Sequence, residues 1–540
     1  MKYNIVVGGA AGQGVKTLAK LIGKTLKHHG FYTFTNTIYM SRIRGGHNFF
    51  QIRFSDQPLY CHEKEADLLI ALNDETYTLH KDDLKAGSFA LLDASSKLGE
   101  ENIIKINAKS YEKDVNVKKS STYVTLGAIA KLFNLDKNIS TRDLNTDQSK
   151  AFGAGYDDQK VLYSTLPPSK DKSISINGNE ATALGAIAAG MDFFSAYPMT
   201  PATSVMTYLS DKQDQCGYIV EQAEDEIAAM NMATGASYAG ARTFVATSGG
   251  GFALMTEALG MSAIAELPIV VLNVQRPGPA TGMPTKTSQS DLSFILHSSP
   301  DEYPRMIISL TDASNAFYQT FRAFNIADKY QMPVILLSDR YLADARVTIS
   351  PYDLNGLVID RSLADENMTS FKRHEITESG ISPRLLPGNP NHTVFADSHE
   401  HDESVNIVED ADMRVKMHDK RLRKLETLKS ELIDPDYYGN EDAKTVLVGW
   451  GSSSGLLKEV TQDLDLGALV FGDIYPLPSE RISQLKAKGV KFISVEHNAT
   501  GQFAKYLRGE TGITMDHQLL KYDGRQFDIK ELKSKVLEVM

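Results

Sequence analysis

Short apolar runs alternate with longer segments of helical character along most of the chain. The run 267–274 is almost entirely apolar, which is typical of a buried parallel strand covered on both faces. Between residues 66 and 133, the apolar runs 67–72 and 89–93 alternate with helical stretches, as in a doubly wound sheet. We expect further strands near 242–247, 333–338, 468–471 and 491–495. The pattern predicts an α/β protein with several doubly wound, Rossmann-like domains.

Polar stretches and proline-rich turns divide this pattern into five parts. They are a first domain at 1–165, a linker at 166–172, a second domain at 173–350, a polar stretch at 351–440 and a last α/β domain at 441–540. Within the second domain, three consecutive glycines at 249–251 predict a tight turn before a helix.

The polar stretch 351–440 contains the one group of residues that suggests a metal site. His399, His401, Asp402 and Glu403 offer metal-ligand side chains, but their spacing matches no common site. We therefore expect a solvated excursion and no metal ion held by this chain. The strongly charged helix predicted at 412–432 is expected to be exposed or to lie at an interface.

Composition narrows the class of protein. The 540 residues are enough for three or four domains, and 57 Lys and Arg against 68 Asp and Glu give a net charge of −11. This acidic balance argues against nucleic-acid binding as the main role. Only two cysteines, no signal peptide and no apolar stretch of about 18 residues predict a cytoplasmic protein without a membrane span.

Three separate segments carry residues suited to a cofactor and an anionic substrate. The loop 197–201 reads Tyr-Pro-Met-Thr-Pro, and its two prolines stiffen the backbone around Thr200. An acidic run ends at Glu226 and leads into a helix of small residues. Arg276 follows the predicted strand 267–274, at the sheet edge where ligands of open α/β sheets bind. A surface turn, a solvated acidic patch and an exposed arginine would be the purely structural interpretation.

This constellation resembles the 2-oxoacid:ferredoxin oxidoreductases, thiamine diphosphate enzymes that decarboxylate 2-oxo acids and form an acyl-CoA. The loop matches the family's Tyr-Pro-x-Thr-Pro motif, and Glu226 matches its pyrimidine-binding glutamate by the nine-residue lead to Gly235. Arg276 matches the substrate arginine near the start of the segment 274–291. The resemblance covers nearly the whole chain and is weakest between 350 and 440. It implies that thiamine diphosphate contacts Tyr197, Pro198, Thr200, Pro201 and Glu226.

The resemblance also implies catalytic roles for Glu226, Thr200 and Arg276. A glutamate beside N1′ of the aminopyrimidine favours the imino tautomer, which serves as the internal base for C2 of the thiazolium ring. The Arg276 guanidinium suits the substrate carboxylate because it can pair two oxygens at once. Thr200 could hydrogen-bond the substrate or its reacting carbonyl. Lys286 and Thr287 could reach a second carboxylate or a partner chain, with surface exposure as the alternative for Lys286.

Part of the expected active site is missing from this sequence. It has no Gly-Asp-Gly motif of the kind that binds the diphosphate and its metal, and Cys61 and Cys216 alone cannot ligate an iron–sulfur cluster. The resemblance implies a smaller beta subunit that holds the diphosphate, Mg²⁺ and a 4Fe–4S cluster. It further implies ferredoxin as the electron carrier, coenzyme A as co-substrate and a dimer of heterodimers.

The start of the chain resembles the family's gamma domain, fused here ahead of the alpha part. A strand runs into a glycine loop and then a helix, an arrangement that favours an anion, although the spacing matches neither standard nucleotide fingerprint. In the family the gamma domain is linked with coenzyme A. The residues that could contact it are Gly12, Gln13, Gly14, Arg42 and Arg44, with packing against other domains as the alternative.

These observations predict a fused gamma–alpha subunit of a 2-oxoacid:ferredoxin oxidoreductase. We favour 2-oxoglutarate as substrate because the segment 276–287 looks most like that branch, with succinyl-CoA as product and carboxylation, a form of carbon fixation, as the reverse reaction. Pyruvate or a branched-chain 2-oxo acid is the first alternative. A transketolase-like two-component thiamine enzyme without ferredoxin, and a non-catalytic anion-binding assembly subunit, are the others.

Overall fold

Three sheets dominated by parallel strands organise the protein. The computed structural model describes residues 1–40, 45–169 and 172–540. The chain divides into two compact units, which are described separately. The first consists of Met1–Ile176, Asp344–Tyr352 and Asp528–Lys533, and the second of Asn177–Ala343, Asp353–Phe527 and Ser534–Met540. The predicted α/β fold is confirmed, while the division into five segments stays a prediction.

The first unit contains an eight-stranded sheet in the order β6-β5-β4-β1-β3-β2-β14-β7. Strands β1, β4, β5 and β6 are parallel, and β3 is antiparallel to both β1 and β2. Its strands are β1 (Lys2–Ala11), β2 (Tyr32–Ile38), β3 (Gly45–Ser55), β4 (Ala66–Ala71), β5 (Leu84–Asp93), β6 (Ile103–Ile106), β7 (Ile174–Asn177) and β14 (Arg346–Ile349). Its helices are α1 (Val15–His28), α2 (Asp74–His80), α3 (Ala108–Val115), α4 (Ser120–Leu132), α5 (Lys137–Thr141) and α6 (Thr146–Asp157).

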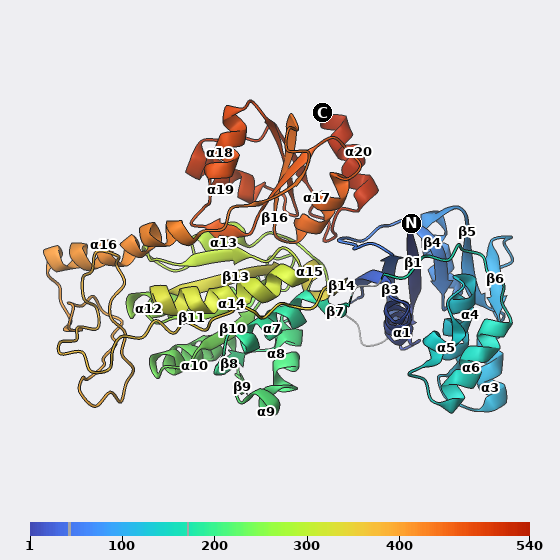
Figure 1. Ribbon diagram of the computed structural model, residues 1–540, viewed down its shortest axis with the longest axis horizontal. Coiled ribbons are helices and arrows are strands. Elements are labelled where there is room, and N and C mark those ends of the chain that lie inside the picture. The colour runs from blue at the N-terminus through green and yellow to red at the C-terminus, as the bar shows by residue number, and fades with distance from the viewer. Residues whose placement is uncertain (41–44, 170–171) are drawn as a thin grey trace. The chain divides into compact units, whose positions relative to one another are not determined.

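Helices α4 and α6 cross at unusually short range within this unit (Figure 1). A Cβ atom added to Gly127 on α4 would lie 1.9 Å from the carbonyl oxygen of Phe152. A Cβ atom on Gly155 of α6 would lie 1.9 Å from the carbonyl oxygen of Val124. Both positions therefore require glycine, because the two helix backbones touch each other there.

The second unit contains a seven-stranded sheet in the order β18-β12-β13-β11-β10-β8-β9 and a five-stranded sheet in the order β15-β17-β16-β19-β20. Its strands are β8 (Phe193–Ala196), β9 (Ile219–Gln222), β10 (Thr243–Thr247), β11 (Ile269–Gln275), β12 (Met306–Ser309), β13 (Pro333–Asp339), β15 (Asp436–Gly439), β16 (Thr445–Trp450), β17 (Gly467–Phe471), β18 (Asp473–Tyr475), β19 (Lys491–Glu496) and β20 (His517–Leu520). The strands expected near 242–247, 267–274, 333–338, 468–471 and 491–495 are confirmed.

Helices cover both faces of the seven-stranded sheet. The helices of this unit are α7 (Gly178–Ala188), α8 (Thr203–Ser210), α9 (Gln213–Cys216), α10 (Glu226–Tyr238), α11 (Gly249–Leu254), α12 (Thr256–Ile264), α13 (Leu292–Leu296), α14 (Ala313–Tyr330), α15 (Arg340–Asp344), α16 (Ala411–Leu428), α17 (Ser454–Val460), α18 (Glu480–Ala487) and α19 (Gln502–Thr511). The last helix of the chain, α20 (Ile529–Val539), crosses the division between the units.

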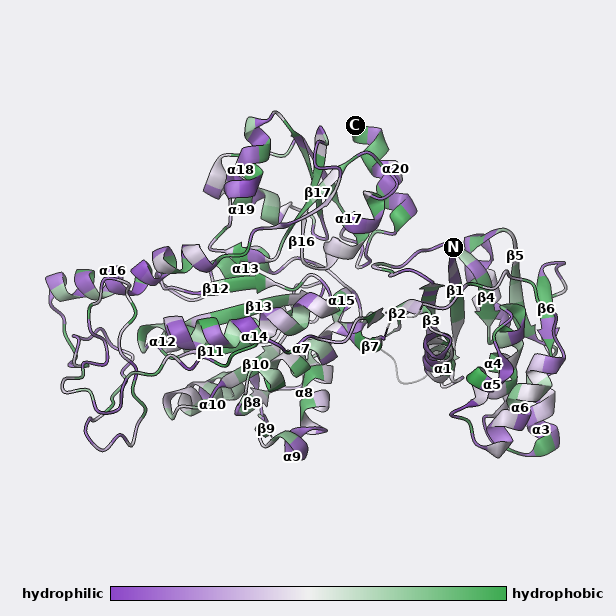
Figure 2. Ribbon diagram, in the orientation of Figure 1, coloured by the Kyte–Doolittle hydropathy of each residue, from purple (hydrophilic) through white to green (hydrophobic). Residues whose placement is uncertain are grey.

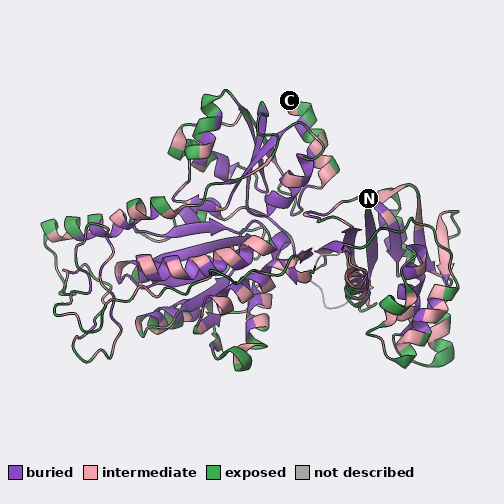
Figure 3. Cartoon of the chain, in the orientation of Figure 1, coloured by how far each residue is buried: buried purple, intermediate pink, exposed green. Residues whose placement is uncertain are grey.

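The central strands of the second unit, among them β11, β13, β16 and β17, are mostly apolar and buried along their length (Figures 2 and 3). In β11, Ile269 and Val271 belong to a core shared with α10, α11 and α12, and this core continues into the five-stranded sheet through Val448 and Trp450. The glycines at 249–251 were expected to form a turn before a helix. That prediction is wrong, because they form the first turn of α11 itself.

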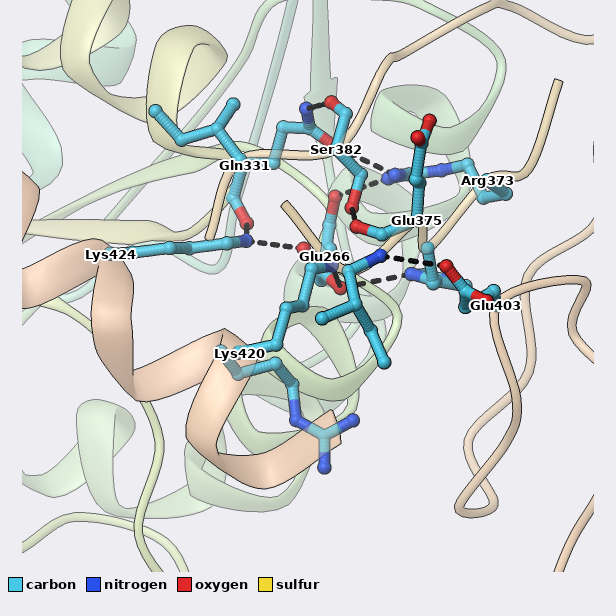
Figure 4. Close-up of polar contacts among 12 residues, drawn as sticks. Glu266, Gln331, Arg373, Glu375, Ser382, Glu403, Lys420 and Lys424 are labelled. Carbon is cyan, nitrogen blue, oxygen red and sulfur yellow. Dashed lines mark hydrogen bonds and ion pairs between the residues drawn. The ribbon is translucent and has the colours of Figure 1, made fainter. Parts of the chain in front are cut away.

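A polar excursion follows the first part of the second unit and ends in helix α16. Most of residues 353–410 lie outside helices and strands. The charged helix was expected to be exposed or to lie at an interface. The exposed alternative is wrong for part of α16, since the side chains of Lys420 and Lys424 are fully buried. Both donate to the carboxylate of Glu266, which also contacts His374 Nδ1 at 2.9 Å (Figure 4).

This buried ion cluster holds the excursion against the sheet-bearing part of the unit. Arg373 donates to the carbonyl oxygen of Glu266 at 2.6 Å and to Gln331 Oε1 at 2.7 Å. Burial lowers the pKa of Lys424 to about 7, although the charge of Glu266 opposes the shift. Charges taken out of water are tolerated only where such partners surround them. None of the helices that the structure describes is long and apolar enough to cross a membrane.

Candidate functional site

Glu226 is a buried carboxylate at the start of a helix. Asp225 caps α10 by accepting a 2.7 Å hydrogen bond from the Ala228 N–H, and Glu226 is the first residue of the helix. The Glu226 side chain is 3% exposed, whereas Glu221, Glu224 and Asp225 in the same acidic run are exposed. Glu226 Oε1 has no hydrogen-bond partner among the described residues. Buried carboxylates are rarely left in this state, which marks the position as a site for a missing partner.

Burial raises the pKa of Glu226, and the nearby charge of Asp225 adds to the shift, while a backbone hydrogen bond opposes it. A carboxyl group with a raised pKa can share a proton with a ligand at near-neutral pH. This is the behaviour required of a group that exchanges a proton with a heterocyclic nitrogen.

Gly251 leaves the space that the Glu226 side chain fills. A Cβ atom at Gly251 would lie 2.6 Å from both Cγ and Oε1 of Glu226 and 2.2 Å from Thr247 Oγ1. Thr247 is the last residue of β10, and its Oγ1 lies 4.0 Å from Sδ of Met199. Glu226 is thereby connected, through Thr247, to the loop that carries Thr200.

That loop joins β8 to α8. Tyr197 is 40% exposed, and the Thr200–Pro201 peptide is cis. The carbonyl oxygen of Pro201 accepts a 2.9 Å hydrogen bond from Asn179, and the carbonyl oxygen of Thr200 accepts one from Arg276 Nη1. The backbone of the loop is therefore held from two sides.

Arg276 follows the last residue of β11 and is partly buried. Burial lowers the pKa of Arg276, and the negative charge of Asp291 opposes the shift. Asp291 Oδ2 accepts a 2.9 Å hydrogen bond from Asn273, and its backbone N–H donates to Gln275 Oε1 at 3.0 Å. Asp291 and β11 thus hold the segment that follows Arg276.

The three sequence-predicted residues come together at one edge of the seven-stranded sheet. Strands β8, β10 and β11 are neighbours and parallel, so their carboxyl ends lie side by side. The loop bearing Thr200 follows β8, Thr247 ends β10, and Arg276 follows β11. Glu226 joins them because its side chain lies beside Thr247, as the space at Gly251 shows. Ligands of open α/β sheets bind at this edge.

Lys286 and Thr287 lie further along the segment after Arg276. Thr287 is buried, donates to Asp339 Oδ1 at 3.2 Å and accepts from the Tyr341 N–H at 3.1 Å. Burial lowers the pKa of Lys286, with Arg340 and then Arg525 contributing. The Thr287 hydroxyl is therefore used in hydrogen bonds within the protein, whereas Lys286 is a partly exposed cation. Their roles toward a substrate stay predictions.

The glycine loop of the first unit is shaped by its backbone. Gly12 and Gly14 have φ angles of 95° and 84°, a region that favours glycine. Gln13 Oε1 accepts hydrogen bonds from the Ala10 N–H at 2.8 Å and from Asn73 at 2.9 Å. Arg42 and Arg44, predicted as coenzyme A contacts, lie outside the described residues.

Sequence reasoning missed two elements of this site. Asn273 and Asp291 form a hydrogen-bonded pair that supports the segment after Arg276. The signal for Asn273 was a single polar amide within an otherwise apolar strand, where a buried polar group needs a partner. The role of Gly251 had no such signal, since only the folded chain brings it to Glu226.

Comparison with known proteins extends this picture. Residues 184–420 match the family described as pyruvate flavodoxin/ferredoxin oxidoreductase, thiamine diP-binding, and residues 4–152 match pyruvate ferredoxin/flavodoxin oxidoreductase. A 2-oxoacid:ferredoxin oxidoreductase subunit alpha from Sulfolobus sp is 31% identical over 100% of this chain and 97% of its own length. The chain belongs to the 2-oxoacid:ferredoxin oxidoreductase family, as its alpha subunit. The predicted resemblance is confirmed.

Two further similar proteins carry 2-oxoglutarate in their names. The 2-oxoglutarate synthase subunit KorA of Methanocaldococcus jannaschii is 32% identical over 58% of this chain and 86% of its own length. A solved 2-oxoglutarate:ferredoxin oxidoreductase from Magnetococcus marinus, with 2-oxoglutarate, coenzyme A and succinyl-CoA bound, superposes with a TM-score of 0.93. It is 31% identical and covers 100% of this chain and 99% of its own.

The residues present fit a thiamine-type cofactor. The matched thiamine diphosphate-binding region contains Thr200, Glu226 and Arg276. Glu226 offers a buried carboxylate oxygen that has no partner in the described part of the chain, which is what a ring nitrogen that carries or shares a proton requires. Because Gly251 has no Cβ atom, the Glu226 carboxylate has room to lie against it.

Proposed function

We propose that this chain is the fused gamma–alpha subunit of a 2-oxoglutarate:ferredoxin oxidoreductase. The reaction joins 2-oxoglutarate and coenzyme A to give succinyl-CoA and carbon dioxide. The C1–C2 bond breaks, a C–S bond forms, and the two electrons released reduce two oxidised ferredoxins by one electron each, while the thiol proton goes to solvent. With sufficiently reduced ferredoxin the same reaction runs as a carboxylation.

The observation that carries this proposal is the buried carboxylate of Glu226 at the carboxyl edge of the sheet, whose Oε1 has no hydrogen-bond partner among the described residues. Thiamine diphosphate, when bound, supplies the carbon nucleophile for the 2-oxo group. Glu226 would hold the aminopyrimidine ring of this cofactor through its carboxylate, and its raised pKa suits it for sharing a proton with a ring nitrogen. Pro198 and Pro201 keep the loop at Tyr197 and Thr200 stiff, so that its residues would hold the cofactor in a fixed place.

Arg276 binds the carboxylate next to the 2-oxo group. Its guanidinium has one N–H bonded to the Thr200 carbonyl, which fixes the direction of the fork and leaves other donors for the substrate. The Thr200 hydroxyl orients the reacting carbonyl. Lys286, a partly exposed cation on the same segment, receives the second carboxylate of 2-oxoglutarate.

A beta subunit completes the enzyme. Cys61 is buried and Cys216 is exposed, and neither has three further cysteines to share a cluster. The partner therefore holds the 4Fe–4S cluster, the diphosphate and Mg²⁺, and two such heterodimers associate. Ferredoxin accepts the electrons, and the glycine loop at Gly12, Gln13 and Gly14 contributes to coenzyme A binding.

Substitution of Glu226 tests the proposal. Glu226→Gln keeps the size of the side chain but removes the exchangeable proton, so we expect a loss of at least about a hundredfold in kcat, the scale of a positioned proton-transfer group. Glu224→Gln, on an exposed neighbour in the same acidic run, is the matched control and should retain full activity. The assay is viologen reduction by the complete complex, with thiamine diphosphate content measured in parallel.

The outcome separates the proposal from its alternatives. Full activity of Glu226→Gln would refute the assignment and favour a non-catalytic assembly subunit. A preference for pyruvate or 2-oxoisovalerate over 2-oxoglutarate would move the chain to another branch of the family. Substrate use without coenzyme A and without electron transfer would favour a transketolase-like enzyme.

A further inference from the structure

The segment 276–291, which begins directly after β11, is held at its far end by the five-stranded sheet. Gln289 is 1% exposed. Its Nε2 donates to the carbonyl oxygen of Trp450 at 2.8 Å, and its Oε1 accepts from the His497 N–H at 3.1 Å. Its own N–H donates to the carbonyl oxygen of His497 at 2.8 Å, and its carbonyl oxygen accepts from Asn498 Nδ2 at 3.1 Å. All four polar groups of Gln289 are therefore bonded to residues that end or directly follow strands of this sheet.

These partners lie at the place in the five-stranded sheet where a ligand would be expected. Strand β16 ends at Trp450, and His497 and Asn498 directly follow β19, its parallel neighbour. The chain passes from β16 to β17 on one side and then to β19 on the other, so the strand order reverses between β16 and β19. In open α/β sheets, ligands bind outside the carboxyl ends of the strands at such a reversal. In this protein Gln289, a residue of the same chain, occupies that position.

A buried carboxylate holds two of these partners in place. Glu496 ends β19 and accepts hydrogen bonds from Asn498 Nδ2 at 2.8 Å and from Trp450 Nε1 at 3.4 Å. It also accepts from the N–H groups of Phe503 at 2.9 Å and Ala504 at 3.0 Å. Burial raises the pKa of Glu496, although these hydrogen bonds oppose the shift. Through Asn498 and Trp450, Glu496 orients the groups to which the segment is bonded.

His497 and Gly451 complete the position that Gln289 occupies. The Phe527 N–H can only donate, so His497 Nε2 accepts from it at 3.4 Å and the ring proton lies on Nδ1. Nδ1 lies 3.2 Å from Gln289 Oε1 and donates a second hydrogen bond to it. Gly451 has a φ of 56°, and a Cβ atom built there would lie 3.2 Å from Gln289 Nε2 and 2.7 Å from Ser309 Oγ. Glycine at this position therefore leaves room for the amide.

Contacts on both sides of Gln289 extend the attachment. The Thr287 N–H donates to the carbonyl oxygen of Gly524 at 3.1 Å, and a Cβ atom built on Gly524 would lie 2.9 Å from Lys286 Cβ. Gln502 Nε2 on α19 donates to the carbonyl oxygen of Ser290 at 2.8 Å. The backbone from 286 to 290 is therefore held by the part of the chain that forms and follows the five-stranded sheet. The place of Lys286 depends on this attachment.

We propose that Gln289 is a positioning residue for 2-oxo acid binding: the five-stranded sheet binds its amide and so sets the place of Lys286 and of the segment that starts at Arg276. Hydrogen bonds fix direction and register, because they weaken steeply when their angle changes. The part of this segment in substrate binding rests on the proposed function, whereas the identity of the acid does not enter the inference. A purely structural role, in which Gln289 only joins the two sheets, is the alternative.

Gln289→Met tests the inference because it keeps the length of the side chain and removes its amide. The KM of the complete complex for the 2-oxo acid that the wild type prefers should rise at least about tenfold, the scale expected when buried polar groups lose a partner, while kcat stays within about twofold. Hydrogen exchange of the peptide 277–290, which needs no turnover, should become faster. Gln502→Met removes the contacts at Ser290 and Ser293 from a partly exposed side chain and should raise the KM about threefold.

Val446→Ala is the control for stability. Val446 lies in the core of the same sheet, so its truncation should lower the thermal midpoint and leave the KM and the exchange of 277–290 unchanged. An unchanged KM in both Gln289→Met and Gln502→Met, a loss confined to kcat, or an equal rise in KM in Val446→Ala would overturn the proposal in favour of a purely structural role. If Gln289→Met does not assemble, the KM of Gln502→Met decides. A wild-type complex that prefers pyruvate, with these KM effects intact, would count against the proposed function alone.

Discussion

Replacing Gly251 by alanine separates the stability of helix α11 from the geometry of Glu226. Gly251 lies in the first turn of α11, and alanine in a helix interior is favoured over glycine by about 1 kcal/mol. The new Cβ atom would lie 2.6 Å from Glu226 Cγ, about 1 Å short of the ~3.5 Å at which carbon atoms pack without repulsion. It would also lie 2.2 Å from Thr247 Oγ1, so either the Glu226 and Thr247 side chains or the helix itself must move.

The expected effect falls on catalysis more than on folding. Misplacing a reacting group by about 1 Å costs about a hundredfold in rate, equivalent to about 2.7 kcal/mol in activation free energy. Overpacking destabilises a folded protein by about 1–3 kcal/mol, and the higher helix propensity of alanine partly offsets this loss of stability. We therefore expect Gly251→Ala to form a folded complex whose kcat falls about a hundredfold, measured by 2-oxoglutarate-dependent viologen reduction and by the thermal midpoint.

Gly235→Ala is the matched control for this substitution. Gly235 also lies in a helix and is exposed, and a Cβ atom built there meets no atom of the described residues within 4 Å. We expect Gly235→Ala to keep full activity and to raise the thermal midpoint slightly. Full activity of Gly251→Ala would refute the claim that the place of the Glu226 side chain decides the rate. An unfolded Gly251→Ala would show that the steric cost exceeds the helix gain.

Three further substitutions test other contacts. Arg276→Lys keeps the charge but loses the planar fork, so the KM for 2-oxoglutarate should rise at least tenfold in steady-state assays; an unchanged KM would contradict the carboxylate contact. Glu266→Gln leaves Lys420 and Lys424 buried without a counter-ion, which should lower the free energy of unfolding by about 3–5 kcal/mol and lower the thermal midpoint. The control Glu426→Gln, at an exposed position on α16, the helix that carries both lysines, should leave the thermal midpoint unchanged. The pKa of Lys424, about 7 when folded against 10.5 in the unfolded chain, means that the unfolded chain binds more protons between these values. Stability should therefore rise with pH from 7 to about 10, and Lys424→Met should reduce that rise when thermal midpoints at pH 7.5 and 9.5 are compared.

Local signals in the sequence predicted much of the arrangement around Thr200, Glu226 and Arg276. Two prolines marked the stiff loop at Thr200, and the apolar run before Arg276 placed this arginine at the end of a strand. Glu226 was recognised because the small-residue helix begins directly after the acidic run, and the structure starts α10 at that residue. These signals work because each depends on residues close together in the chain.

Contacts between residues far apart in the chain could not be predicted from such local signals. The charges of α16 indicated a helix that is exposed or at an interface, but the carboxylate of Glu266, more than 150 positions away in the chain, pairs with Lys420 and Lys424 in the interior. Strand β14 joins the first unit although in sequence it lies between two long segments of the second unit. The close approach of the Glu226 side chain to Gly251 likewise arises only when the chain folds.

The most direct test of the account is a substrate assay on the complex purified through a tag on this chain. Viologen reduction is followed with 2-oxoglutarate, pyruvate and 2-oxoisovalerate, each with and without coenzyme A. The account predicts rapid, CoA-dependent reduction with 2-oxoglutarate and formation of succinyl-CoA. A complex that contains thiamine diphosphate and iron but reduces viologen with none of the three acids would contradict it.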